Sequence, residues 1–369
     1  MKEGWKMAKI RFALIGSGWR SEFYIRIAKS MPETFELAGV LVRDPERGNA
    51  FADSFQVSVV NRLDDLLACS PDFVVVATKR GTIKDYLIRL FQRNIPVLCE
   101  TPPGETEKDL LELWETAQEY NARVQVAEQY FAQPLYAAWY EAVRNNLIGK
   151  VETIRLSALH GYHGVSMIRR MLGTGFQNCT LYGKRYHFDV VETYGREGMC
   201  FDGQPFSCPC DRFTMEFENG AVAFFDFSDP AQYHSFIRTR QMTIQGERGE
   251  IDDFTIRYLS ESNVPVCQNL NRIDLGVYGN QEWSHFGIML GEQFLYRSPF
   301  LNARLNDDEI AVATVLQGME NYLQTGEEIY SFADALQDMY LSIKMDEAVQ
   351  SPFQPVATIS QPWGKQKAN

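Results

Sequence analysis

The sequence predicts an α/β protein of two domains, with a doubly wound parallel sheet of the Rossmann type in residues 1–127 and an α+β domain in residues 128–369. Three observations predict this fold class. The chain has 369 residues, more than one ordinary hydrophobic core holds. Apolar runs alternate with helix-period segments as far as Ala127, and β-rich segments follow from Val151. A glycine turn, Gly16-Ser17-Gly18, separates the first apolar run from the first helical segment.

The apolar runs of the first domain are continuous rather than alternating, as expected for parallel strands that are covered on both faces. They lie at Ile10–Ile15, Leu37–Val42, Val57–Val60, Phe73–Ala77, Val97–Cys99 and Val124–Ala127. Helix-period segments lie between them at Ser21–Ser30, Glu46–Phe55, Leu63–Ala68, Ile83–Arg93 and Thr106–Tyr120. This order predicts a doubly wound sheet of about six strands.

The glycine turn indicates a dinucleotide site. Its two glycines allow a tight turn and a close approach to a pyrophosphate, and the helix that follows directs free N–H groups at the anion. Ser21 stands at the third position of the G-x-G-x-x-G pattern and is small enough for close helix–strand packing. Arg20 is interpreted either as a contact to the pyrophosphate or as a solvated surface arginine.

The second domain begins with a linking helix at Pro134–Asn145 and continues with segments typical of a largely antiparallel sheet. Two helices close the chain, the first capped by Asn306 or Asp307 and the second by Ser331. We expect the segment from Gly183 to Arg212 to be a long irregular excursion, and the tail after Pro352 to be loosely held. The predicted strands of this domain are Val151–Leu159, Arg212–Glu218, Ala221–Phe227, Arg240–Gln245 and Glu250–Leu259.

Charge and composition argue against several classes of protein. The net charge of −12 disfavours nonspecific binding to nucleic acid, which needs clustered Lys and Arg. No apolar run approaches the roughly 20 residues of a membrane helix. Seven cysteines without a disulfide pattern, and an N-terminus without a secretory leader, lead us to expect a cytoplasmic protein. Cys208 and Cys210 lack partner ligands at a recognised spacing, so we expect no metal site.

Several blocks of sequence resemble the Gfo/Idh/MocA family of NAD(P)-dependent oxidoreductases along nearly the whole chain. They are GSGWRS, VVVATKR, VLCETPPGE, NNLIGKVETIRLS and HGYHGVSMIRRMLG. The resemblance implies a Rossmann domain followed by a domain whose open sheet often mediates oligomer contacts, here a homodimer or homotetramer. It also implies hydride transfer at a hydroxyl or carbonyl of a sugar, an inositol or a related polyol.

The resemblance and the fold together give a set of expected cofactor-binding residues at the turn and at the strand ends: Gly16, Ser17, Gly18, Trp19, Arg20, Arg43, Thr78, Lys79, Glu100, Thr101 and Gln129. After the second strand, Val42 stands where family members often carry the aspartate that binds the ribose 2′-hydroxyl. Arg43 follows directly, and an arginine can pair with a 2′-phosphate, so we favour NADP over NAD. Asp44 leaves open that the acidic ligand is shifted by two residues.

Two catalytic positions of the family are substituted. The family's Glu-Lys-Pro corresponds to Glu100, Thr101 and Pro102, so the lysine is a threonine. His163, ten residues before Gly173, matches the family histidine, and Leu159 replaces the aspartate four residues earlier.

His163 is therefore the expected proton-transfer residue, because histidine titrates near neutral pH. Lys79 or Arg80 is a candidate for the missing positive charge, although both could instead pair with cofactor phosphates or solvent. Glu128 could bind a sugar hydroxyl or act with His163, or it could be a cap or an interdomain contact.

Three functions follow from these residues. The first is an NAD(P)-dependent oxidoreductase on a polar, sugar-like substrate. The second is a non-catalytic dinucleotide-binding regulator or sensor, suggested by the substitutions at Thr101 and Leu159. The third is a glycosidase of the kind that retains NAD and oxidises its substrate transiently.

Overall fold

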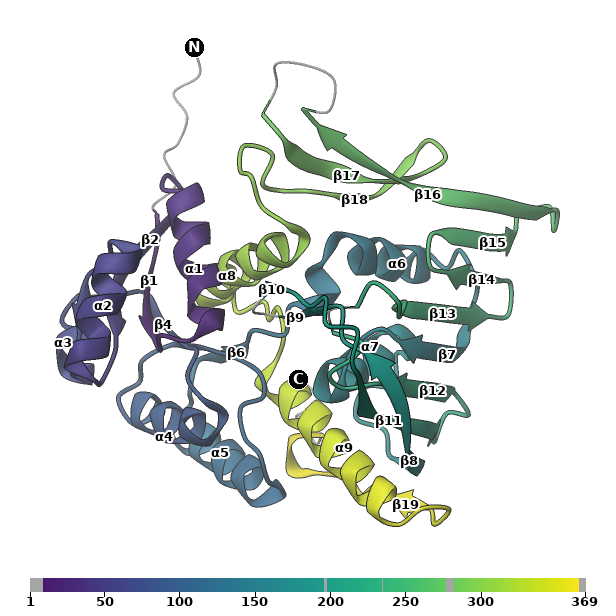
Figure 1. Ribbon diagram of the computed structural model, residues 1–369, viewed down its shortest axis with the longest axis horizontal. Coiled ribbons are helices and arrows are strands. Elements are labelled where there is room, and N and C mark those ends of the chain that lie inside the picture. The colour runs from purple at the N-terminus through teal and green to yellow at the C-terminus, as the bar shows by residue number, and fades with distance from the viewer. Residues whose placement is uncertain (1–8, 196–197, 234, 277–281, 365–369) are drawn as a thin grey trace. The chain divides into compact units, whose positions relative to one another are not determined.

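The computed structural model describes residues 9–195, 198–233, 235–276 and 282–364. The chain clusters into two compact units, each of which is discontinuous in sequence. The first comprises Met1–Pro134, Ile273–Gly287 and Arg297–Leu336, and the second comprises Leu135–Arg272, Ile288–Tyr296 and Gln337–Asn369. The first unit thus consists of the N-terminal region and two segments from much later in the chain (Figure 1).

The first unit contains a six-stranded parallel sheet with the order β3-β2-β1-β4-β5-β6, which confirms the predicted doubly wound fold. Phe12 of β1 and Phe73 of β4 stack at 6.1 Å between ring centroids in its fully buried centre. The carboxyl ends of all six strands point to one edge, where ligands of such sheets bind. The strands are β1 (Ile10–Ile15), β2 (Phe35–Leu41), β3 (Val59–Val60), β4 (Phe73–Val76), β5 (Val97–Cys99) and β6 (Val124–Val126).

Two helices of this unit begin earlier than the apolar periodicity predicts. Helix α1 starts at Trp19 and α4 at Arg80, two and three residues earlier than expected, because the exposed first turn of a helix contributes little to its buried face. The capping box of Asn306 and Glu309 confirms the predicted start of α8. The helices are α1 (Trp19–Ser30), α2 (Pro45–Phe55), α3 (Leu63–Leu67), α4 (Arg80–Phe91), α5 (Glu107–Glu119), η1 (Tyr130–Ala132) and α8 (Asp307–Thr325).

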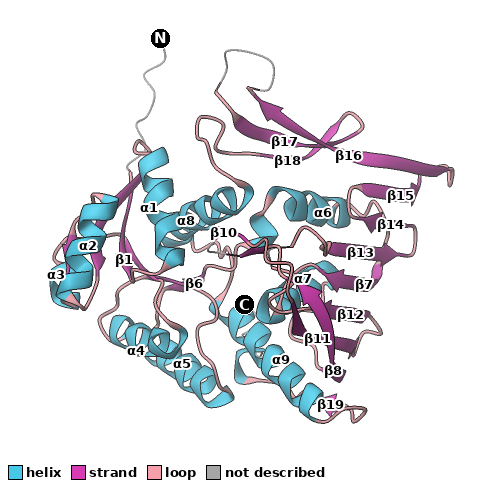
Figure 2. Ribbon diagram, viewed as in Figure 1, coloured by secondary structure: helices cyan, strands magenta, loops and turns pink. Residues whose placement is uncertain are grey.

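The larger sheet has eleven strands in the order β18-β17-β16-β15-β14-β13-β7-β12-β11-β8-β19 (Figure 2). Its pairs are largely antiparallel, as predicted, with a parallel pair between β7 and β12. Helix α7 packs on β7 and β12. The strands are β7 (Val151–Ser157), β8 (Cys179–Val191), β11 (Pro205–Phe217), β12 (Val222–Phe227), β13 (Gln241–Gly246), β14 (Gly249–Asp252), β15 (Thr255–Leu259), β16 (Pro265–Leu275), β17 (Ser284–Leu290), β18 (Gln293–Arg297) and β19 (Val356–Ala357).

Three further helices carry the remaining sequence: α6 (Pro134–Arg144), α7 (Gly161–Leu172) and α9 (Phe332–Gln350). The hydroxyl of Ser331 accepts the backbone N–H of Asp334 at 2.9 Å, which confirms the predicted cap of α9. No helix in the described part of the chain combines the length and the apolar character that crossing a membrane requires.

The expectation of an irregular excursion from Gly183 to Arg212 is wrong. Strands β8 and β11 pair continuously, from Cys179 opposite Phe217 to Val191 opposite Pro205. Between them lie two short strands, β9 (Tyr194–Gly195) and β10 (Gly198–Met199). The polar composition of β8 and the proline at position 209, which pairs with His187 inside the ladder, hide the strand pattern in the sequence.

The expectation of a loosely held tail after Pro352 is also wrong for the described residues. Strand β19 pairs with β8, and the short helix η2 (Pro362–Gly364) carries Trp363, which is 1% exposed. Its indole N–H donates to Oε1 of Gln337 at 2.8 Å. A single tryptophan and a two-residue strand give no periodic signal, so the sequence could not reveal this attachment.

Candidate functional site

The glycine turn has the geometry of a ligand cradle. Gly16 has a φ of +130°, and a Cβ atom there would lie 2.1 Å from the carbonyl oxygen of Ala77, so only glycine fits. Its backbone N–H donates to the carbonyl of Leu41 at 3.1 Å, which ties the end of β1 to β2. Packing against the neighbouring strand ends therefore requires a glycine at position 16.

Gly18 has a different role. It is the N-cap of α1 and offers no side chain to the free N–H groups of the first turn, and a Cβ atom there would meet nothing within 4 Å. Open space before an uncapped helix terminus is what an approaching pyrophosphate requires. Ser21 is fully buried in this first turn, and its hydroxyl has no partner among the described residues. The turn therefore fits a dinucleotide phosphate.

Two other residues of the turn were predicted to bind cofactor. Trp19 is 47% exposed and packs edge-on against Phe23, with ring centroids 4.8 Å apart. The carbonyl of Ser17 accepts a hydrogen bond from Nη2 of Arg47 at 2.9 Å. Sequence reasoning missed Arg47, since a solvent-exposed arginine in the first turn of a helix carries no motif.

Arg43, the residue predicted to select NADP over NAD, follows β2 and is accessible. Arg43 is exposed, whereas the preceding Val42 is buried. Asp44 is the N-cap of α2 and accepts the backbone N–H of Arg47 at 2.9 Å. The Asp44 carboxylate is thus engaged by its own helix, which is the local reason for an acidic residue at this position.

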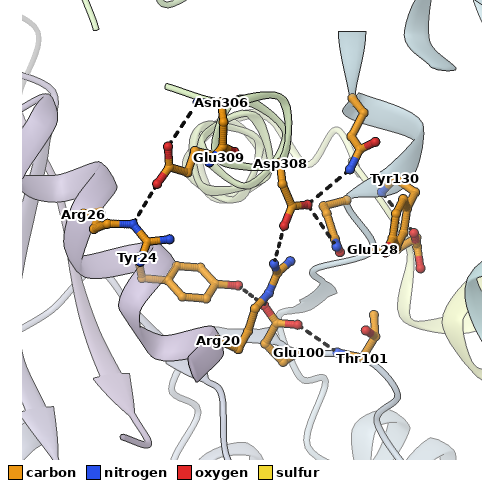
Figure 3. Close-up of polar contacts among 12 residues, drawn as sticks. Arg20, Tyr24, Arg26, Glu100, Thr101, Glu128, Tyr130, Asn306, Asp308 and Glu309 are labelled. Carbon is orange, nitrogen blue, oxygen red and sulfur yellow. Dashed lines mark hydrogen bonds and ion pairs between the residues drawn. The ribbon is translucent and has the colours of Figure 1, made fainter. Parts of the chain in front are cut away.

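Arg20 is buried in a polar network rather than solvated (Figure 3). Its Nε donates to Oε1 of Glu100 at 2.8 Å, and its Nη1 donates to Oδ2 of Asp308 at 3.1 Å. Burial disfavours the positive charge, but the two carboxylates outweigh it and raise the pKa of Arg20 above its usual range. Tyr24 donates its hydroxyl to the same Glu100 oxygen, and burial and the Glu100 charge raise the Tyr24 pKa. The network holds a permanently charged guanidinium at the ends of β1 and β5.

Asp308 is the residue of this network that the sequence did not reveal. It lies in the first turn of α8, which the Asn306 capping box fixes in place. Its Oδ1 accepts from Nε2 of Gln129 at 3.4 Å and from Nε2 of Gln133 at 3.3 Å. Two aspartates follow Asn306 in the sequence, but acidic residues at a helix start are explained equally well by the helix dipole and capping. The hydrogen-bond partners of Asp308 lie about 175 to 290 positions away in the chain, so no local motif indicates them.

Glu128 is a buried carboxyl group whose pKa is raised to near neutral pH. It is fully buried, and Oε1 accepts the backbone N–H of Tyr130 at 3.1 Å. Burial is the main cause that raises its pKa to about 8, while the Tyr130 N–H and Arg20 act in the opposite direction. At neutral pH this carboxyl group is protonated and can therefore donate a hydrogen bond or a proton.

The remaining predicted residues of the first unit lie at neighbouring strand ends. Lys79 is the exposed N-cap of α4, and no ion pair or hydrogen bond of its side chain occurs within the described ranges. Thr78 accepts a hydrogen bond from the Thr82 hydroxyl at 3.0 Å. Thr101 is half-buried, and its backbone N–H donates to Oε2 of Glu100 at 3.3 Å. None of these contacts assigns Lys79 or Thr101 to a substrate.

His163 lies in the second unit, in the first turn of α7, and is half-buried. It belongs to an aromatic cluster in which its ring centroid lies 4.9 Å from His160 and 5.3 Å from Tyr162. His160, the N-cap of α7, also lies 4.6 Å from the ring of Tyr233. These ring contacts hold both histidines at the start of α7.

Comparison with known proteins gives a family match for the N-terminal region. The profile of the oxidoreductase family with an NAD-binding Rossmann fold, Gfo/Idh/MocA, matches residues 10–128. The matched residues include the glycine turn, Glu100 and Glu128, but not Asp308.

Two curated relatives and one solved structure extend the comparison. YteT from Bacillus subtilis is 26% identical over 195 residues, and the 2,7-anhydro-N-acetylneuraminate hydratase of Mediterraneibacter gnavus is 27% identical over 148 residues. These alignments cover 50% and 39% of this chain, and they span 46% and 38% of the two relatives, less than half of their lengths. An oxidoreductase from Agrobacterium radiobacter, solved with NAD+, L-tartaric acid and magnesium, has 16% identity, a TM-score of 0.69 and coverage of 95% of this chain and 98% of its own. It shares the fold of both regions.

Proposed function

We propose that the protein is an NAD(P)-dependent oxidoreductase that transfers a hydride to or from a hydroxyl or carbonyl of a sugar, an inositol or a related polyol. The observation that carries this proposal is the glycine cradle, in which Gly16 is sterically obligatory and Gly18 faces open space. The match of residues 10–128 to an oxidoreductase family with an NAD-binding Rossmann fold supports the cofactor. A relative named for a neuraminate and a neighbour solved with tartaric acid support a polyhydroxylated substrate.

When bound, the nicotinamide ring accepts or supplies the hydride. The chain must then handle the proton of the hydroxyl group, and we propose His163 for this role. Imidazole titrates near neutral pH, and the half-buried position of His163 among aromatic rings restricts its motion while leaving it accessible. The protonated carboxyl of Glu128 is proposed to donate a hydrogen bond to a substrate hydroxyl, consistent with its raised pKa.

Two cationic side chains are proposed for separate roles. One replaces the lysine of the family, and the other selects between NADP and NAD. Lys79, exposed at the carboxyl end of β4, is the candidate cation for the carbonyl oxygen, because Thr101 cannot hold a charge. Arg43 is exposed after β2 and can pair with a ribose 2′-phosphate, so NADP is the proposed preference. Glu100 is proposed to position Arg20 and Thr101 rather than to transfer protons, since both of its oxygens already accept hydrogen bonds.

The second unit is proposed to join copies of the chain into a homodimer or homotetramer. The exposed aromatic side chains of Tyr182 on β8 and Phe224 on β12 flank the same residue of β11, Thr214, and so lie on one face of the sheet. Such a face favours association. We further propose that this assembly is cytoplasmic.

The proposed function predicts that His163→Ala lowers kcat by about 10²- to 10⁴-fold while leaving dinucleotide affinity unchanged. Nicotinamide absorbance at a series of pH values, with a panel of sugars, cyclitols and sugar acids, measures this effect. His187→Ala is the matched control, because His187 is exposed on β8. Wild-type kinetics that His163→Ala does not change would contradict the role of His163.

A second candidate function has support of its own. A relative that is named a hydratase suggests a reaction without net redox change. The glycosidase alternative is of the same kind. Turnover of a glycoside or anhydro-sugar, with no net change in nicotinamide absorbance, would favour it. Tight dinucleotide binding by a wild-type protein that turns over none of these substrates would favour a regulator, in keeping with Thr101 and Leu159.

A further inference from the structure

Two buried polar atoms of the network around Asp308 have no hydrogen-bond partner among the described residues. They are Nη2 of Arg20, a donor, and Oε1 of Gln129, an acceptor. Gln129 is 5% exposed, and the Arg20 side chain is 17% exposed. Buried polar atoms in folded proteins are almost always paired, so an unpaired donor and an unpaired acceptor in one network indicate a ligand that pairs with both.

Asp308 holds these two side chains together. Its Oδ2 accepts from Nη1 of Arg20 at 3.1 Å, and its Oδ1 accepts from Nε2 of Gln129 at 3.4 Å. The orientation of the Gln129 amide is fixed by this contact, because an ionised carboxylate only accepts hydrogen bonds and the NH2 group must therefore face it. The free atom of Gln129 is consequently its oxygen, and the free atom of Arg20 is Nη2, since Nη1 donates to Asp308.

A free donor and a free acceptor, on two side chains that contact one carboxylate, match a primary amide, whose carbonyl oxygen accepts and whose NH2 group donates. A carboxylate would place a negative oxygen against Oε1 of Gln129, and a hydrocarbon would leave both atoms unpaired. Gln129 follows β6 and Arg20 follows β1, so both lie at the carboxyl edge of the parallel sheet, where ligands of this fold bind. An amide-bearing ligand at this edge satisfies both observations.

We infer that Arg20 and Gln129 bind the carboxamide group of the nicotinamide ring. Nη2 of Arg20 donates to the carbonyl oxygen, and Oε1 of Gln129 accepts from the NH2 group. This inference rests on the proposed function, since it needs a nicotinamide dinucleotide in the glycine cradle. It gives Arg20 a role at the nicotinamide end of the cofactor and makes Asp308 a positioning residue.

The test compares three ligands by isothermal titration calorimetry on the full chain: NAD+, deamido-NAD+, in which a carboxylate replaces the carboxamide, and ADP-ribose, which lacks the nicotinamide ring. We expect the wild-type protein to bind NAD+ about tenfold more tightly than deamido-NAD+. The variant Gln129→Met, which keeps the length of the side chain without the acceptor, should lose this preference and leave the affinity for ADP-ribose unchanged. Gln133→Met is the control, since Gln133 donates to the same Oδ1 of Asp308 at 3.3 Å.

The outcomes separate this inference from the proposed function. Equal wild-type affinities for NAD+ and deamido-NAD+, or a preference that survives in Gln129→Met, overturn the role of the pair while the cofactor site stands. A wild-type protein that binds none of ADP-ribose, NAD+ and NADP+ overturns the cofactor site itself, and the inference with it. The ligand comparison on the wild-type protein needs no variant, so it decides the question even if Gln129→Met does not fold.

Discussion

Replacing Glu128 with glutamine tests the electrostatics of the buried network directly. Glu128 is fully buried, and burial raises its pKa from an ordinary value of 4.5 to about 8. In the unfolded chain the carboxyl group loses its proton near pH 4.5, whereas in the folded protein it keeps the proton to about pH 8. Stability is therefore lost as the pH rises through this window, because folding must take up a proton that is increasingly scarce. Glutamine keeps the shape of the protonated acid and takes up no proton.

The magnitude follows from the two pKa values. The full shift corresponds to about 5 kcal/mol of stability lost between pH 4.5 and pH 8, as an order of magnitude for a buried group. Between pH 6 and pH 8 the free energy of unfolding of the wild-type protein should fall by about 2 kcal/mol relative to that of Glu128→Gln. Other titrating groups are common to both proteins and cancel in the difference.

Urea denaturation followed by tryptophan fluorescence at pH 6, 7 and 8 measures this difference. A free energy of unfolding of the wild-type protein that falls with pH relative to that of Glu128→Gln supports a protonated Glu128 at neutral pH. A gap that stays constant to within about 0.5 kcal/mol refutes the reasoning, because it means that Glu128 is ionised in the folded protein. In that case Glu128 could not serve as a hydrogen-bond donor to a substrate.

Two further predictions concern the cofactor cradle. Gly16→Ala should lower the free energy of unfolding by at least about 2 kcal/mol and abolish dinucleotide binding, because its Cβ would lie 2.1 Å from the Ala77 oxygen. Gly18→Ala should fold normally yet bind ADP-ribose weakly. Equal ADP-ribose affinity in the wild type and in Gly18→Ala would contradict the phosphate cradle. Arg43→Ala should weaken NADP binding by about tenfold and leave NAD binding unchanged, as measured by calorimetry. Equal losses for both dinucleotides would argue that Arg43 does not contact the 2′-phosphate.

Sequence reasoning located the cradle and several residues around it because these positions follow strand ends. Gly16 and Gly18 follow β1, Glu100 follows β5, and Gln129 follows β6. Once the strands are assigned, the parallel topology alone brings such residues to one edge of the sheet. Asp308 was missed because it reaches this edge from a helix near the other end of the chain, and no local pattern encodes that contact.

What the sequence determined by itself was local: which segments form strands and helices, and where a glycine is required. Hydrophobic periodicity and the steric freedom of glycine act over a few residues, so they can be read directly from the chain. The tertiary structure decided the partners and the protonation states. It placed Arg20 between Glu100 and Asp308 and removed Glu128 from water. Those properties depend on burial and on charges far apart in sequence, because the energy of a charge is set by everything that surrounds it in space.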